Sequence, residues 1–169
     1  MTRQAWAIYD QAMKMKEAED CHGAIDKFQE TIDFGAQDPK PANQARAMIQ
    51  ACRDWIVSKR DPVLAQARQA EESSDFPKAF QSYKTATEID PPHPEGYAGM
   101  DRIRGILNRK AKMIYTEAVL AESYSDFETA KKKFEEVLRV APEDDVYHQR
   151  SKRKLSRIFQ PPQREESEP

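Results

Sequence analysis

The chain has 169 residues, of which 33% are charged and 38% hydrophobic, and it contains only 5 glycines. This length suits one domain with a sizeable core, and this composition favours long solvent-facing helices over a β-rich or low-complexity protein. The formal net charge of −2 gives the chain as a whole no attraction for nucleic acid or for an anionic membrane, so an electrostatic partner must recognise a local patch.

No segment approaches the roughly 18 consecutive apolar residues of a membrane-spanning helix, and the first residues lack the apolar run of a signal peptide. We therefore expect a cytoplasmic protein. The two cysteines, Cys21 and Cys52, fall where an apolar helix face places small buried residues. We expect them to be free thiols in a reducing compartment.

The first predicted element is a helical hairpin over residues 3–36. Its second helix resumes after Asp20, and Gly35 is predicted to end that helix in a left-handed conformation. Prolines then interrupt the pattern, and an apolar stripe predicts an inserted helix over residues 42–58. Asp61 followed by Pro62 resembles a helix cap with proline in the first turn, so a new helix is predicted to begin there.

That helix opens a second predicted hairpin, residues 60–91, which a proline-rich segment ends. From residue 95 to 123 the chain has no proline, and apolar residues recur at spacings of three and four, which predicts one long helix. Its first part, residues 95–110, would be a second inserted helix, and a third hairpin would cover residues 111–142. A C-terminal helix is predicted over 144–159, and the proline-rich, charged residues 161–169 are expected to be disordered.

One pattern occurs in all three hairpins: a small residue, an aromatic residue four positions later, and a small or β-branched residue three positions after that. The three copies are Ala24, Phe28 and Thr31; Ala79, Tyr83 and Ala86; and Ala130, Phe134 and Val137. Aspartate and phenylalanine precede the last two copies, and a proline follows both at the same distance.

On these residues the chain resembles the tetratricopeptide repeat family, whose unit is a hairpin of about 34 residues with small residues where its helices cross. Alignment on the pattern puts Ala12, Ala67 and Ala118 at the small position of each first helix. Equivalent alanines lie 55 and 51 residues apart, which leaves room for an extra helix after each hairpin. The resemblance implies an all-α solenoid of about seven helices over residues 1–160, with hairpins joined by extra or elongated helices.

In this family the first helices line a groove that binds a peptide of a partner protein. The resemblance places eight residues in that groove: Trp6, Tyr9, Met13, Leu64, Arg68, Lys112, Tyr115 and Val119. Most are aromatic or aliphatic, so the groove would be apolar, and the Lys and Asn clamp of the chaperone-tail subgroup is missing. Tyr9 and Tyr115 lead the candidates because tyrosine combines contact area with a hydrogen bond. Alternatively, the inserted helices cover both tyrosines, which then belong to the core.

The segment 148–160 is basic and amphipathic, with five cations and no acidic residue: Arg150, Lys152, Arg153, Lys154 and Arg157. One interpretation is a capping helix whose polar side stays in water. The other is a docking site for an acidic partner, an anionic surface or nucleic acid.

The sequence offers no catalytic or cofactor-binding motif. Its three histidines are not spaced to meet on one helix face, and it has no phosphate-binding glycine loop and no metal-binding motif. We therefore expect a non-catalytic adaptor that binds another protein, without metal, cofactor or small-molecule substrate. Homo-oligomerisation through Trp6 or Trp55 is the rival within the same fold, while nucleic acid and membrane are less favoured partners.

Overall fold

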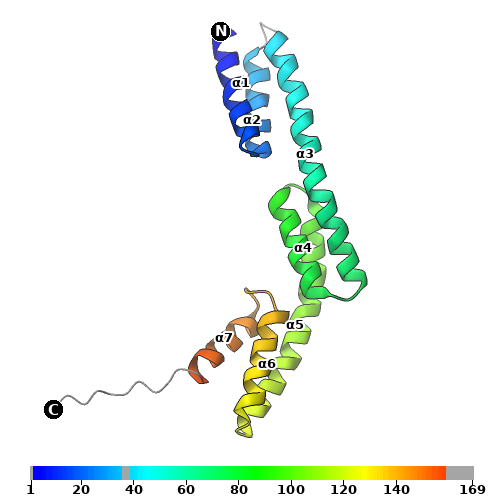
Figure 1. The fold of residues 1–169 in the computed structure, drawn as a ribbon, viewed down its shortest axis with the longest axis vertical. Coiled ribbons are helices and arrows are strands. Elements are labelled where there is room, and N and C mark those ends of the chain that lie inside the picture. Colours follow the sequence, from blue (N-terminus) through cyan, green and yellow to red (C-terminus); the bar gives the residue numbers. More distant parts are fainter. Residues whose placement is uncertain (1, 36–38, 159–169) are drawn as a thin grey trace, which may run out of the picture. The chain divides into compact units, whose positions relative to one another are not determined.

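The computed structural model describes residues 2–35 and 39–158, and within them the regular structure consists of seven α-helices with no strand (Figure 1). This confirms the predicted all-α class. None of the described helices has an apolar stretch long enough to cross a bilayer. Phe159 and the tail 161–169 lie outside the described residues. The helices are α1 (Thr2–Glu17), α2 (Cys21–Phe34), α3 (Pro39–Glu72), α4 (Phe76–Ile89), α5 (Pro94–Ser123), α6 (Phe127–Val140) and α7 (Val146–Ile158).

The helices form two compact units. Of the described residues, unit 1 comprises 2–35, 39–63 and 88–91, and unit 2 comprises 64–87 and 92–158. Helices α3 and α4 therefore contribute to both units. The single domain expected over residues 1–160 stays a prediction.

In unit 1, α1 and α2 form a hairpin, and the first half of α3 packs against it (Figure 1). The side chains of Tyr9 and Met13 pack against the edge of this core. Both cysteines are free and buried, as predicted. The buried members of the core are Ala12, Cys21, Ala24, Phe28, Ala45, Ile49, Cys52 and Ile56.

In unit 2, α4 and α5 approach closely where α5 carries two glycines. A β-carbon at Gly99 would lie 2.6 Å from the ring of Tyr83, so no larger residue fits there without a shift. The second half of α5 packs on α6 around Ala118 and Phe134. Across both units, every residue of the three repeated motifs is at most 2% exposed. The repeated pattern therefore marks the buried centre of each hairpin.

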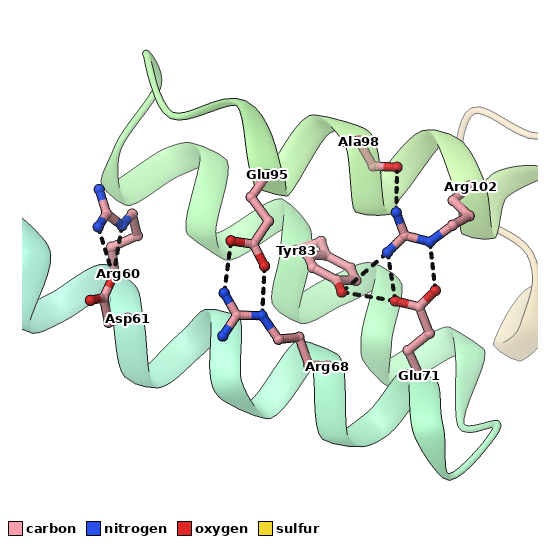
Figure 2. A network of polar contacts seen from close by, with 8 residues as sticks. All are labelled: Arg60, Asp61, Arg68, Glu71, Tyr83, Glu95, Ala98 and Arg102. Carbon is pink, nitrogen blue, oxygen red and sulfur yellow. Dashed lines mark hydrogen bonds and ion pairs between the residues drawn. The ribbon is translucent and has the colours of Figure 1, made fainter.

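A polar network holds α3, α4 and α5 together in unit 2 (Figure 2). The carboxylate of Glu71 accepts hydrogen bonds from Arg102 Nε at 2.7 Å and from the Tyr83 hydroxyl at 2.8 Å. The hydrogen bond from Arg102 holds the pKa of Glu71 below its usual value. One helical turn earlier on α3, Arg68 donates two hydrogen bonds to Glu95, at 2.6 and 2.7 Å. Each pair is a fork-to-fork contact that fixes geometry as well as charge.

The turns of the three hairpins share a feature that sequence analysis missed. Glu19, Ser74 and Ser125 have φ values of 63°, 60° and 60°, and each stands five positions before the first alanine of its motif. The aspartate that follows each of them donates its N–H to a carbonyl five residues earlier, which closes the first helix. The same aspartates, Asp20, Asp75 and Asp126, cap the second helices by accepting from the N–H of Gly23, Lys78 and Thr129.

Two local predictions are wrong. No new helix begins at Asp61 and Pro62, because α3 continues through Pro62, which is exposed. Buried Ile56 and Leu64 anchor α3 on both sides, so packing outweighs the hydrogen bond that the proline removes. Gly35 is not left-handed, since its φ is −82°. A glycine fits there because a β-carbon would lie 3.3 Å from Cβ of Ala42.

The left-handed turns predict a stabilising substitution. Ser125→Gly should raise the free energy of unfolding by about 0.5–1 kcal/mol, because glycine adopts this conformation without the steric cost of a β-carbon. The control Ser82→Gly, within α4, should lower it by about 0.5–1 kcal/mol. Urea denaturation measures both, and a loss of stability in Ser125→Gly would contradict the assignment.

The polar network predicts a pH-dependent loss of stability. At pH 7, Glu71→Gln should lower the free energy of unfolding by about 1–2 kcal/mol, because the charged acceptor is lost. The folded-state pKa of Glu71 is lowered, so its contribution is present above its usual value of 4.5 and disappears as the pH falls through the folded pKa. The two proteins should therefore become equally stable in acid.

The exposed neighbour Glu72 offers the matched control. Glu72→Gln removes the same charge and should change stability by less than about 0.5 kcal/mol. Urea denaturation across the pH range measures both variants. Equal effects of the two substitutions would show that Glu71 stabilises the fold only through its charge and not through its hydrogen bonds in the network.

Candidate functional site: a basic hollow between α5 and α7

The apolar face of α7 is already occupied by protein. Leu155 and Ile158 pack against the cluster that Ala118, Ala130 and Phe134 form between α5 and α6. Ser151 on the same helix is fully buried. This packing fixes the rotation of α7 about its axis, so its remaining faces point in defined directions.

A different face of α7 carries a stripe of cations. Arg150, Arg153, Lys154 and Arg157 follow one another at helical spacing, and together with Tyr115 of α5 they line a hollow of about 250 Å³. Lys152 does not line it. The structure thus brings together two separate predictions, the tyrosine of the expected groove and four of the five cations of the basic segment.

The hollow is strongly positive. Lys154 forms an ion pair with Glu122 at 2.7 Å, and the guanidinium of Arg150 lies over the ring of Tyr147, 5.8 Å from its centroid. The guanidinium groups of Arg153 and Arg157 form no hydrogen bond or ion pair with any other residue that the structure describes. Four cations therefore face one carboxylate, and two guanidinium groups have all their donors available.

Tyr115 forms a rigid wall of this hollow. Its half-buried ring contacts Phe134 and Tyr147, with centroid separations of 5.6 and 5.5 Å. Its hydroxyl forms no hydrogen bond with another described residue. A ring held on two sides, with a free hydroxyl, offers a ready contact for a ligand.

Tyr9 has a different environment in unit 1. Its ring packs on Trp6 and Phe28, with centroid separations of 5.5 and 5.4 Å, and burial raises the pKa of its hydroxyl. Together with half-buried Met13 it lies against the core.

The remaining predicted groove residues lie in unit 2. Lys112 and Val119 are exposed, one turn before and after Tyr115, and share its side of α5. Arg68 is bound to Glu95. Leu64 is only 2% exposed, so it offers no surface to a partner in this structure. Only the α5 part of the expected groove therefore lies beside the basic hollow.

A larger hollow of about 530 Å³ lies between α4, α5 and the segment after α6. One of its two arginines, Arg104, is held by Asp144 at 2.7 Å and lies over the ring of Phe80, 5.3 Å from its centroid. Lys84 and Arg139 share its lining with Glu143 and Asp144. Because the charges are mixed and the central cation is paired, this hollow selects no ligand class.

Two of the three histidines, His22 and His148, take part in structural contacts. Nε2 of His22 lies 2.9 Å from the carbonyl oxygen of Ile89, and Nδ1 of His148 lies 3.0 Å from that of Ala141. Within residues 2–35 and 39–158, no three His, Cys, Asp or Glu side chains converge to hold a metal ion.

Sequence reasoning missed the roles of Glu122 and Tyr147. Glu122 neutralises one cation of the hollow, and Tyr147 supports both Tyr115 and Arg150. The helical spacing of the cations could have shown that Lys152 lies off the stripe.

Searches of protein-family models, of curated proteins and of solved structures found no match to this chain.

Proposed function

We propose that the chain is a non-catalytic protein-interaction module that captures an acidic segment of a partner protein in the hollow between α5 and α7. One observation carries this proposal: Arg153 and Arg157 lie without a carboxylate partner among the described residues, beside the exposed edge of Tyr115. Charge-assisted hydrogen bonds from arginine to carboxylates are strong and directional, and a tyrosine wall adds contact area.

The tetratricopeptide-like assignment belongs to this proposal. It is supported by the complete burial of the alanines at the helix crossings, Ala12, Ala67 and Ala118, and of the three motifs. Helices α3 and α5, with 34 and 30 residues, are the elongated helices that the repeat spacing requires. A solenoid of this kind would act as an adaptor, here in the cytoplasm.

An acidic protein segment fits the site better than a membrane or nucleic acid. Insertion into a bilayer would need the apolar face of α7, and Leu155 and Ile158 are already packed inside the protein. A nucleic acid needs a track of cations along its backbone, whereas the cations that line this hollow lie on one short helix. On α5 and α6, Glu117 and Glu136 lie close to Lys133 and balance it.

The purely apolar groove suggested by the sequence has less support. Leu64 is buried, Arg68 is bound to Glu95, and Tyr9 packs on Phe28. Tyr115 borders a hollow whose other lining residues are basic. We therefore favour recognition through charge with an aromatic contact.

Charge-neutralising variants test this site. With a fluorescein-labelled peptide rich in Glu, Arg153→Gln should raise the Kd about tenfold, because one charge-assisted contact is lost. Lys152→Gln removes the same charge from the same helix outside the hollow and should change the Kd less than about twofold. Fluorescence anisotropy measures both, and circular dichroism checks that both variants fold.

Three results would contradict the proposal. Equal losses in the two variants would indicate general attraction to a positive helix. No loss in either would move the binding site away from α7. Tighter binding of a single-stranded oligonucleotide than of the acidic peptide would favour the nucleic-acid alternative.

A further inference from the structure

We propose that the hollow selects a phosphorylated side chain, phosphoserine or phosphothreonine, within the captured segment. This inference rests on the proposed function, because it specifies which anion of a partner peptide occupies the hollow. Three properties of the hollow support it: its charge, the type of its cations and its size.

The charge of the hollow exceeds what one carboxylate can balance. Arg150, Arg153, Lys154 and Arg157 line it, and of the described acidic groups only Glu122 pairs with one of them. A single Glu or Asp of a partner would still leave most of this positive charge unmatched. A phosphoryl group carries a charge of about −1.5 to −2 at neutral pH and balances more of it at one point.

Three of the four cations are arginines, and their planar side chains determine which anion geometry the hollow can bind. A guanidinium presents a planar fork of N–H donors, and one fork engages both oxygens of a carboxylate. A phosphoryl group has three terminal oxygens that several guanidinium groups can share. Arg153 and Arg157 make no contact with a carboxylate among the described residues, so both forks are free to converge on one anion.

The shape of the hollow also suits a phosphorylated side chain. Its volume of about 250 Å³ holds a phosphoryl group together with the short stem of a serine or threonine. Tyr115 supplies a wall and a hydroxyl without a described partner, and its contacts with Phe134 and Tyr147 keep it in place. This wall of the site is thereby ordered before the ligand arrives.

Three synthetic peptides test this inference on the full chain. They share one acidic sequence and differ at a central residue, which is Ser, Glu or phosphoserine. Fluorescence anisotropy should give a Kd for the phosphoserine peptide at least about tenfold lower than that for the Glu peptide, with the Ser peptide weakest. Lys152→Gln, outside the hollow, should keep this order.

Arginine-to-lysine variants separate geometry from charge. Arg153→Lys and Arg157→Lys keep the positive charge but lose the planar fork. Each should weaken binding of the phosphoserine peptide more than binding of the Glu peptide, and should therefore lose most of the preference for phosphoserine. Retention of the full preference in both variants would contradict the proposed role of the arginines.

The outcomes distinguish this inference from the proposed function. Equal affinity for the Glu and phosphoserine peptides would overturn the phosphoryl inference and leave acidic-segment capture standing. Binding of none of the three peptides would overturn both. Tighter binding of a single-stranded oligonucleotide than of the phosphoserine peptide would assign the hollow to nucleic-acid phosphate and also overturn the inference.

Discussion

The close approach of two helices at paired alanines is the constraint on which the three hairpins depend. Each first helix contributes one fully buried alanine, at positions 12, 67 and 118, and each second helix contributes another, at positions 24, 79 and 130. Only a small side chain lets two backbones approach this closely, and the aromatic residue four positions later then fills the adjoining space. The left-handed residue and the capping aspartate lie in the turn that joins the two crossing helices of each hairpin. Backbone geometry and core packing therefore repeat together in the chain.

The long helices explain why these hairpins are more than 50 residues apart. The first half of α3 covers α2, and the first half of α5 covers α4 through its two glycines. The second half of each long helix then begins the next hairpin. Helix α7 covers α6 in the same way, and the described structure ends with it. Because it packs with its apolar face, its other face is left to carry the arginine stripe that defines the candidate site.

The sequence predicted the fold class, the three hairpin centres and the long α5, because these depend on patterns that are local in the chain. It failed at Pro62, where anchoring by Ile56 and Leu64 outweighs local propensity. It also missed the left-handed turns, since Glu19, Ser74 and Ser125 are not the glycine or asparagine usual there. For the site, the basic character of α7 was evident from composition. The proximity of the arginine stripe of α7 to Tyr115 depends on how α7 packs on α5 and α6, and no local sequence pattern encodes that packing.

The central claim is that ligand recognition occurs between Tyr115 and the arginine stripe of α7. The most direct test is an NMR titration of the full chain with the phosphoserine peptide, following the arginine Nε–Hε signals and the tyrosine ring signals. We expect the signals of Arg153, Arg157 and Tyr115 to shift together and saturate at one Kd, while those of Tyr9 stay unchanged. Shifts centred on Tyr9 and Trp6, with Arg153 and Arg157 unaffected, would contradict the account and place the binding site on the first hairpin.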